Sequence, residues 1–443
     1  MGLRITVIGL GYLGVTHAVA MVEFGHEVLG IEPDSQKLES LKQGKVPFFE
    51  PGLQDALEKA LATGRLHFSP SHTDFSKTAD VHFLCVGTPQ ETNSFRANTD
   101  YVFGATKEVA SVVRENAIVV GKSTVPVGTA EKLQQLLNEI AGFDVSLAWN
   151  PEFLREGTAL EDSRHPDRIV IGSQYPETFA VLRTVYQPAT DAGSPFIEMD
   201  IETSELVKVA ANSFLATKIS FINAMAEIAE VTGADTVKLA EAIGYDERIG
   251  NKFLKTGIGF GGGCLPKDIR AFMARAEELG VQDAVDFLRD IDAINQRRRE
   301  RVIEILENEL GDLKGKTIGI LGAAFKPQSD DLRDSPALHI ALSVKARGAK
   351  VQIHDPKAGM GVKRGYPEFV VVENSIDVFR ESDAVILATE WSEYTSIEPQ
   401  KAIEMAKNPL IIDGRNVLDV KRWLDAGWNL YALGRSVQRK NNE

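Results

Sequence analysis

The sequence predicts an α/β protein with two Rossmann-like doubly wound domains, joined by a long central helix in a helical dimerisation region. Apolar strand patterns alternate with helix patterns from Leu3 to about Asp200, which is typical of a mainly parallel sheet. Residues at helical spacing, without Gly or Pro, then predict one helix from about Ser204 to Val231. Strand patterns return after the turn-rich residues 311–316. We therefore expect domains at residues 1–200, 201–310 and 315–437.

The first expected domain opens on a dinucleotide-binding pattern. The chain predicts a strand over Leu3–Ile8, a glycine turn at 9–14 (GLGYLG), a helix to Phe24 and a second strand, Glu27–Ile31, followed by Glu32. Glycines let a pyrophosphate approach the backbone, the helix N-terminus favours its charge, and the acid accepts hydrogen bonds from ribose hydroxyls. The competing interpretation is a plain βαβ unit. Because Glu32 would repel a 2′-phosphate, the pattern favours NAD over NADP.

The third expected domain faintly repeats the first. Residues 25–33 and 348–356 each contain a glycine, a strand and an acid followed by proline. The turn at 322–327 (GAAFKP) lacks the full glycine pattern and carries a lysine, which predicts contact with a different phosphate. Two nucleotide folds in one chain suggest NAD and a nucleotide-bearing substrate. Other strands are expected at Val81–Val86, Ala117–Gly121, Val145–Trp149, Thr317–Leu321, Lys350–His354, Ala384–Ala388 and Leu410–Ile412.

The composition and charge of the chain indicate which binding partners and which cellular location to expect. The 443 residues carry a formal charge of -14, which opposes nucleic acid and anionic membranes as partners. No apolar run reaches the roughly 18 residues of a membrane span, and the chain begins on a strand rather than a secretion signal, so we expect a cytoplasmic protein. The two cysteines, Cys85 and Cys264, provide neither a disulfide framework nor a zinc set, and the eight histidines show no ligand spacing. No metal is expected.

Cys264 is the strongest indication of chemistry in the chain. A glycine-rich run at 259–263 precedes it, and Leu265–Asp268 reads as the start of a helix. A helix N-terminus and the nearby Lys267 should favour the thiolate, which is the nucleophilic form, over a thiol with the reference pKa of about 8.5. The competing interpretation is an inert buried cysteine behind a flexible loop.

Eight motifs, in order along the chain, resemble the UDP-glucose/GDP-mannose 6-dehydrogenase family. They are GLGYLG at 9–14, CVGTP at 85–89, STVPVGT at 123–129, NPEFLREG at 150–157, ELVKVAANSF at 205–214, GFGGGCLPKD at 259–268, FKPQSDDLRDSP at 325–336 and DGRNVLD at 413–419. The resemblance implies a four-electron oxidation in which C6 of a sugar nucleotide becomes a carboxylate while two NAD molecules are reduced. It favours UDP-glucose, with GDP-mannose or a UDP-N-acetylhexosamine as alternatives.

The same resemblance implies catalytic roles for six residues. Cys264 would form a thiohemiacetal and then a thioester, Lys208 and Asn212 would stabilise oxyanions, and Asp268 would orient a water or Lys208. Glu152 would be the base for hydrolysis, with Thr124 holding the water. Lys208 and Asn212 stand four apart on the expected long helix and therefore share a face.

Binding residues follow from the resemblance as well. For NAD it implies Gly9, Gly11, Tyr12, Leu13, Gly14, Glu32, Lys37, Gly87, Thr88, Thr124, Glu156 and Arg333. For the sugar nucleotide it implies Glu152, Phe153, Leu154, Lys208, Asn212, Arg248, Lys255, Phe260, Gly261, Phe325, Lys326 and Arg415. Arg248 would come from the neighbouring subunit, which implies a homodimer or a higher homo-oligomer.

Several alternatives stay open at this point. Lys208 and Asn212 fit an exposed helix stripe, and Glu152 fits a helix cap after a strand. A two-electron hydroxy-acid dehydrogenase would share the first domain, and a silent nucleotide-binding protein would share the whole fold. Two departures from the family pattern, Glu32 in place of Asp and Gly263 in place of Ser, leave NAD affinity and sugar choice undecided.

Overall fold

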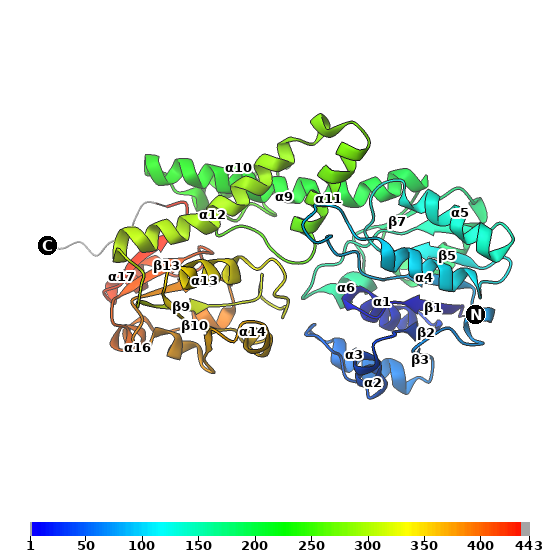
Figure 1. Ribbon diagram of the computed structural model, residues 1–443, viewed down its shortest axis with the longest axis horizontal. Helices are drawn as coiled ribbons and strands as arrows, with labels where there is room; N and C mark the ends of the chain where they lie inside the picture. The colour runs from blue at the N-terminus through cyan, green and yellow to red at the C-terminus, as the bar shows by residue number, and fades with distance from the viewer. Residues whose placement is uncertain (1, 436–443) are drawn as a thin grey trace. The chain divides into compact units, whose positions relative to one another are not determined.

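The computed structural model describes residues 2–435 (Figure 1). Contacts divide the chain into two compact units. The first comprises the residues up to Ala211 with Arg270–Gln282, and the second comprises Asn212–Ile269 with the residues from Asp283 onward. The expected three-domain division stays a prediction, and its last boundary, residue 437, lies outside the described residues.

The first unit is built on an eight-stranded sheet with the order β3-β2-β1-β4-β5-β6-β7-β8. Neighbouring strands are parallel except β6 and β7, which are antiparallel. The order runs outward from β1 in both directions, as in a doubly wound dinucleotide-binding sheet. The strands are β1 (Arg4–Ile8), β2 (Glu27–Ile31), β3 (Leu66–Ser69), β4 (Val81–Leu84), β5 (Ile118–Gly121), β6 (Ser146–Trp149), β7 (Ile169–Ser173) and β8 (Phe196–Met199).

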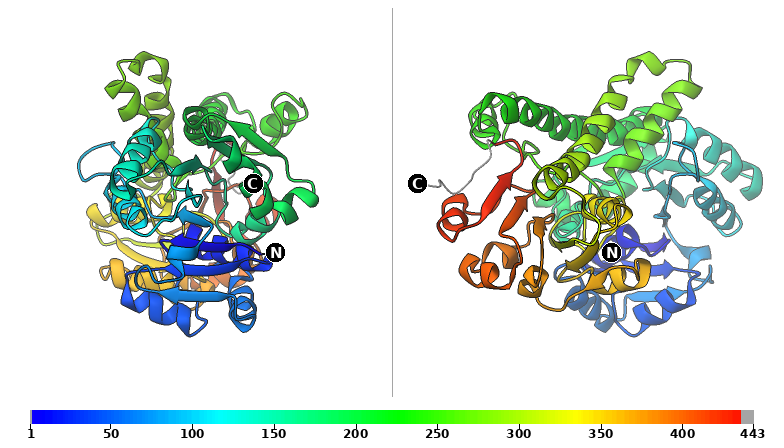
Figure 2. Two further views of the ribbon diagram at one scale, coloured as in Figure 1. Left: turned by 90° about the vertical axis from the view of Figure 1, so that its right-hand side faces the viewer. Right: turned by 60° about the vertical axis from the view of Figure 1, so that its left-hand side comes forward.

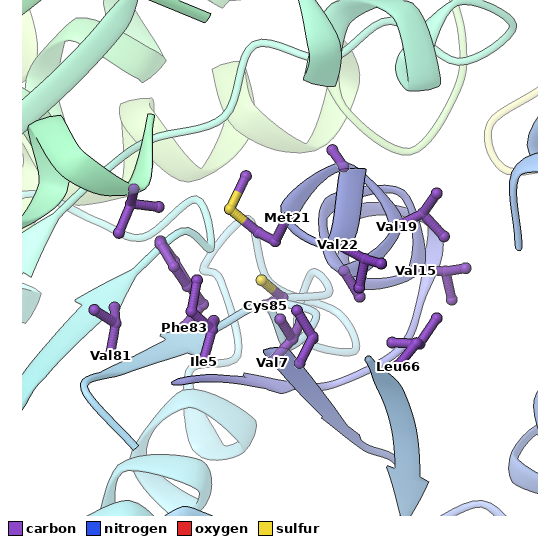
Figure 3. Close-up of a cluster of buried hydrophobic side chains, with 14 of the residues drawn as sticks. Ile5, Val7, Val15, Val19, Met21, Val22, Leu66, Val81, Phe83 and Cys85 are labelled. Atoms are coloured by element: carbon purple, nitrogen blue, oxygen red, sulfur yellow. The ribbon is translucent and has the colours of Figure 1, made fainter. Parts of the chain in front are cut away.

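Helices cover both faces of this sheet because side chains alternate along each strand. Ile5 and Val7 of β1 belong to one buried apolar cluster, whereas Ile8 belongs to the other. Figure 3 shows Cys85 in the first cluster, beside Val7 and below the helix that carries Val22. The helices are α1 (Tyr12–Glu23), α2 (Ser35–Lys42), α3 (Leu53–Ala62), α4 (Asp100–Ala110), α5 (Thr129–Ala141), α6 (Ala159–Arg164), α7 (Pro176–Val185) and α8 (Gln187–Asp191), with a 3-10 turn, η1 (Ser76–Thr78).

The predicted long helix is α9 (Ile201–Thr232), which runs unbroken through the junction after Ala211 (Figure 2). Its predicted bounds, Ser204 and Val231, are close to those observed. The helical region also contains α10 (Thr236–Gly244), α11 (Leu265–Glu278), η2 (Gln282–Ala284) and α12 (Phe287–Leu310).

The second unit contains a six-stranded, all-parallel sheet with the order β11-β10-β9-β12-β13-β14. This is again the doubly wound order, so the predicted fold class is confirmed in both parts of the chain. The strands are β9 (Thr317–Leu321), β10 (Lys350–His354), β11 (Val370–Val371), β12 (Ala384–Leu387), β13 (Leu410–Asp413) and β14 (Asn429–Ala432). The helices are α13 (Pro336–Ala346), α14 (Gly359–Gly365), α15 (Ser392–Thr395), α16 (Pro399–Met405) and α17 (Val420–Asp425), with η3 (Ser375–Phe379).

Within residues 2–435, none of the helices combines the length and the apolar character that a membrane span requires.

Candidate active site

The glycine turn after β1 has the geometry that a dinucleotide requires. Gly9 adopts a φ of +88°, and a Cβ at Gly14 would overlap the carbonyl oxygen of Gly9, so both positions demand glycine. Gly11 precedes α1 and has nothing within 4 Å of the position that a Cβ would take. This open space above a helix N-terminus fits a pyrophosphate. Glu32 is buried at the end of β2 and accepts hydrogen bonds from Leu10 N (3.1 Å) and Asp34 N (3.0 Å).

Two other residues expected at the cofactor site join separate loops of the first unit. Tyr12 donates to Glu50, and Gly157 N donates to the Tyr12 hydroxyl (2.8 Å) and to Glu50 (2.7 Å). The Thr88 hydroxyl donates to the carbonyl of Thr124 (2.7 Å). These bonds fix the loops after β4, β5 and β6 at the carboxyl ends of the strands, where open α/β sheets bind ligands. The sequence motifs gave no indication of Glu50, which stands outside all of them.

Glu152 and Lys208 form a buried ion pair. Lys208 Nζ lies 2.9 Å from Glu152 Oε1, with 5% and 13% of the two side chains exposed. Glu152 Oε2 also accepts from Leu154 N (2.6 Å), and the nearest following helix, α6, begins only at Ala159. The exposed-stripe interpretation of Lys208 is therefore wrong, and Glu152 does not cap a helix.

A buried lysine that the sequence analysis did not single out lies behind this pair. Lys122, at the end of β5, donates to Asn150 Oδ1 (3.0 Å) and the Tyr186 hydroxyl (3.4 Å), and burial lowers its pKa to about 8. Lys122, Asn150, Tyr186 and Glu152 line one pocket of the first unit. The only sequence signal was the position of Lys122 directly after a strand and before the 123–129 motif. Cys85 nearby is inert, because burial raises its pKa to about 12.

In the second unit, Cys264 stands where the sequence predicts it. It is exposed, and Asp268 N donates to its carbonyl oxygen (2.9 Å), which makes it the residue immediately before the first turn of α11. Asp268 is buried and accepts from Asn212 Nδ2 (2.6 Å) and Lys267 Nζ (2.6 Å). Lys267 is thus paired with a carboxylate, which corrects the expectation of a simple positive charge beside the thiol. Asn212 is buried too, so it does not belong to an exposed stripe.

The glycine run before Cys264 packs closely against other backbone and side chains. A Cβ at Gly257 would overlap the carbonyl oxygen of Gly414, and one at Gly262 would lie 2.8 Å from the Phe325 ring. A Cβ at Gly263 would meet the guanidinium of Arg333, the far end of an exposed side chain that can move aside, so the structure does not explain glycine in place of serine there. These glycines allow the backbone before Cys264 to pack closely against neighbouring segments of the second unit.

The cations expected to bind the substrate differ in their surroundings. Arg415 donates to the carbonyls of Ala388, Gly259 and Phe325, so its guanidinium connects three backbone segments. Arg248 and Lys255 are exposed, and Arg248 pairs with Asp246 of its own chain. Among the other residues expected at the substrate, Lys326 Nζ lies 5.5 Å from the Phe325 ring centroid, Lys208 Nζ lies 5.6 Å from the Phe153 ring centroid, and Phe260 and Gly261 are buried.

The remaining residues expected at the cofactor have varied surroundings. Arg333 pairs with Asp331, and Leu13 lines the pocket that contains Lys122. Lys37 and Gly87 are exposed, and Glu156 is partly buried.

Comparison with known families accounts for nearly the whole chain. Residues 3–190 match the NAD binding domain of the UDP-glucose/GDP-mannose dehydrogenase family, residues 202–297 its central domain, and residues 319–420 its UDP binding domain. The chain belongs to this family.

Full-length relatives agree with the family models. The chain is 39% identical to the UDP-glucose 6-dehydrogenase YwqF of Bacillus subtilis (strain 168), covering 98% of both chains. It is 36% identical to a UDP-glucose 6-dehydrogenase of Rhizobium meliloti (strain 1021), covering 98% of this chain and 100% of the relative. A solved UDP-glucose dehydrogenase from Pyrobaculum islandicum matches with a TM-score of 0.91 and 37% identity, covering 98% of each chain.

Family membership decides two of the open questions. The chain is an NAD-dependent dehydrogenase, which confirms the cofactor predicted from the glycine turn and Glu32. It also carries a UDP binding domain, for which a hydroxy-acid dehydrogenase has no use, so that alternative is wrong.

Proposed function

We propose that this member of the UDP-glucose/GDP-mannose dehydrogenase family oxidises UDP-glucose at C6 to UDP-glucuronate, in two two-electron steps that reduce two NAD molecules. The names of the full-length relatives support the substrate. The observation that carries the chemistry is Cys264, an exposed thiol at the start of α11 beside the buried pair of Asn212 and Asp268.

The first unit supplies the cofactor site in this proposal. The turn around Gly11 would hold the pyrophosphate, and Glu32 would select NAD by accepting bonds from the adenosine ribose. When bound, NAD accepts a hydride from C6 in each oxidation. The observed fit lies in the open space at Gly11 and in the position of Glu32 at the end of β2.

Cys264 divides the oxidation into steps. After C6 has become an aldehyde, the thiolate adds to its carbon and forms the C–S bond of a thiohemiacetal. The second oxidation converts this adduct into a thioester. Lys208 and Asn212, one helical turn apart on α9, would stabilise the oxyanions, and one well-placed donor is worth about 2.7–4 kcal/mol.

Hydrolysis releases the product. Glu152 would take a proton from a water held with Thr124, the water would attack the thioester carbon, and the C–S bond would break with the thiolate as the leaving group. The pairing of Glu152 with Lys208 keeps the carboxylate in one orientation for this role. Asp268 would hold Asn212 and Lys267 in place, as its two hydrogen bonds indicate.

A homodimer is part of the proposal. Phe214, Phe221 and Ile228 recur every seven residues on α9 and are 67%, 48% and 54% exposed, which gives one face of the helix a row of exposed apolar side chains. A second copy would bury them. Arg248 is exposed, as a residue that reaches a neighbouring subunit must be.

A cytoplasmic location also stays a prediction.

The stoichiometry of NADH tests the function. We expect two NADH per UDP-glucose consumed, and less turnover with GDP-mannose or UDP-N-acetylhexosamines at equal concentration. One NADH per sugar would contradict the four-electron oxidation, and none with any sugar nucleotide would indicate a silent binding protein. Faster turnover of another sugar nucleotide would reassign the substrate and leave the chemistry in place.

A further inference from the structure

One buried side chain forms hydrogen bonds with the backbone of Phe260, four residues before Cys264. Asn295 of α12 accepts a hydrogen bond from Phe260 N (2.7 Å) and donates one to Phe260 O (2.9 Å). The Asn295 side chain is wholly buried. The side-chain amide of Asn295 therefore satisfies both the N–H and the C=O of Phe260, as the backbone of a neighbouring strand does in a sheet.

Arg299, one turn further along α12, forms a further hydrogen bond with the backbone of Phe260. It donates to Phe260 O (2.9 Å) and to Asp334 Oδ1 (3.0 Å), and it is almost wholly buried. Gly262 N then donates to the carbonyl of Arg333 (2.9 Å). The segment from Phe260 to Gly262 is thus held on one side by α12 and on the other by residues 333 and 334.

The glycines complete the arrangement. A Cβ at Gly259 would overlap Asn295 Oδ1, and a Cβ at Gly261 would overlap the carbonyl oxygen of Asp334. Glycine at these positions is what allows α12 and the 333–334 segment to approach the loop. Because the loop leads directly into Cys264, its path determines where the sulfur stands.

We propose that Asn295 is a positioning residue for Cys264, acting through Phe260 and supported by Arg299. No sequence motif indicated it, because its partner lies 35 residues earlier in the chain. The inference rests on the proposed function, in which Cys264 is the nucleophile. Asparagine suits the position because its amide presents one acceptor and two donors on a short arm, whereas an aspartate can only accept when it is ionised.

The test compares Asn295→Asp with Asn308→Asp, the same substitution at an exposed position of the same helix. Asn295→Asp removes the bond to Phe260 O with almost no change in volume. We expect kcat with UDP-glucose to fall about 10²-fold, the loss that a misplacement of about 1 Å can produce, with the KM for NAD within about twofold of wild type. We expect Asn308→Asp to match wild type in both constants.

A second readout does not depend on turnover. Iodoacetamide should alkylate Cys264 about tenfold more slowly in Asn295→Asp than in Asn308→Asp, because a thiolate displaced from the N-terminus of α11 loses its stabilisation. Intact-mass analysis should leave Cys85 unmodified in both variants. If wild type makes no NADH from any sugar nucleotide, the proposed function fails, and the alkylation rates still decide the role of Asn295.

If Asn295→Asp does not fold, as judged by loss of the cooperative thermal unfolding transition, Arg299→Lys replaces it in the test. Lysine keeps the positive charge, but its single ammonium group cannot bind Phe260 O and Asp334 at the same time as the two guanidinium nitrogens of Arg299 do. We therefore expect kcat to fall about tenfold with NADH binding retained. A lower melting temperature with unchanged kcat and alkylation rate in the folded variants would mean that Asn295 only stabilises the fold, and would overturn the proposal.

Discussion

The six strands of the second sheet have the same order as the first six strands of the first sheet, but the turns after β1 and β9 form different hydrogen bonds. In the first, Gly9 and Gly14 pack tightly while Gly11 faces open space, and Glu32 accepts from one backbone N–H of the turn, that of Leu10. In the second, Asp355 Oδ2 accepts from the N–H groups of both Ala323 (2.8 Å) and Ala324 (2.9 Å). The equivalent carboxylate therefore occupies the donors that a phosphate would use.

This difference predicts two ways in which the same fold binds a nucleotide. The first turn has open space at Gly11, at the start of α1, where we expect a pyrophosphate to approach the backbone. The second turn satisfies its own amides, and Ala323 and Ala324 are fully buried. We therefore expect a nucleotide bound to the second unit to rely on side chains such as Lys326, and that role of the lysine stays a prediction.

The largest effect should come from a residue that belongs to neither turn. Cys264→Ser should lower kcat at least about 10³-fold, because a hydroxyl ionises far less readily than a thiol and cannot form the thioester. Binding of NAD and of UDP should stay within about threefold of wild type in calorimetric titrations, since the substitution changes neither the turn at Gly11 nor Lys326. Wild-type-like turnover would eliminate the covalent mechanism, and loss of NAD binding would place the cysteine in the cofactor site.

Glycine-to-alanine substitutions in the turns after β1 and β9 should affect NAD binding in one case and stability in the other. Gly11→Ala places a methyl group in open space, so we expect an unchanged melting temperature and a KM for NAD raised about 10²-fold. Gly322→Ala forces a φ of +101° on a residue with a Cβ and overlaps Thr389, so we expect a loss of about 1–3 kcal/mol of unfolding free energy. Steady-state kinetics and urea unfolding measure both effects. A destabilised Gly11→Ala with normal NAD kinetics would contradict the contrast between the turns.

The sequence predicted local features well and long-range contacts poorly. The strand Glu27–Ile31 was predicted to the residue because a short apolar run bounded by Gly25 and Pro33 is a local signal. Strands β3, β7, β8, β11 and β14 went unnamed, and exposure explains only some of these misses: two of the four β8 residues are exposed, whereas all five residues of β7 are buried. The resemblance to the family supplied the site residues, but the partners of Phe260 and Gly157, which are Asn295 and Glu50, depend on tertiary contacts that no local pattern encodes.

Buried carboxylates provide a pH test in the first unit. Glu205 of α9 accepts from Gly128 N (2.7 Å) and Ala130 N (2.8 Å) at the start of α5, yet burial raises its pKa from 4.5 to about 7. The folded state therefore binds more protons than the unfolded state between these values. Stability should fall by roughly 3 kcal/mol as the pH rises from 4.5 to 7, and Glu205→Gln should remove that part of the dependence. Urea unfolding at several pH values, followed by circular dichroism, measures it, and an unchanged slope in Glu205→Gln would assign the dependence to other groups.

The smallest expected effect compares the two carboxylates directly. Glu32→Gln removes the charge that repels a 2′-phosphate, so we expect the KM for NAD to rise about tenfold and the KM for NADP to fall, which lowers the NAD preference. Asp355→Asn removes the equivalent charge from a turn whose amides are internally bonded, so the ratio of NAD to NADP activity should not change. It should instead lower the unfolding free energy by about 1–3 kcal/mol, because each carboxylate oxygen of Asp355 accepts from two backbone N–H groups, and the oxygen replaced by NH2 leaves both of its donors without an acceptor. If Asp355→Asn shifted coenzyme preference as Glu32→Gln does, the second turn would also have to lie near the coenzyme, and the division of labour between the two sheets would be wrong.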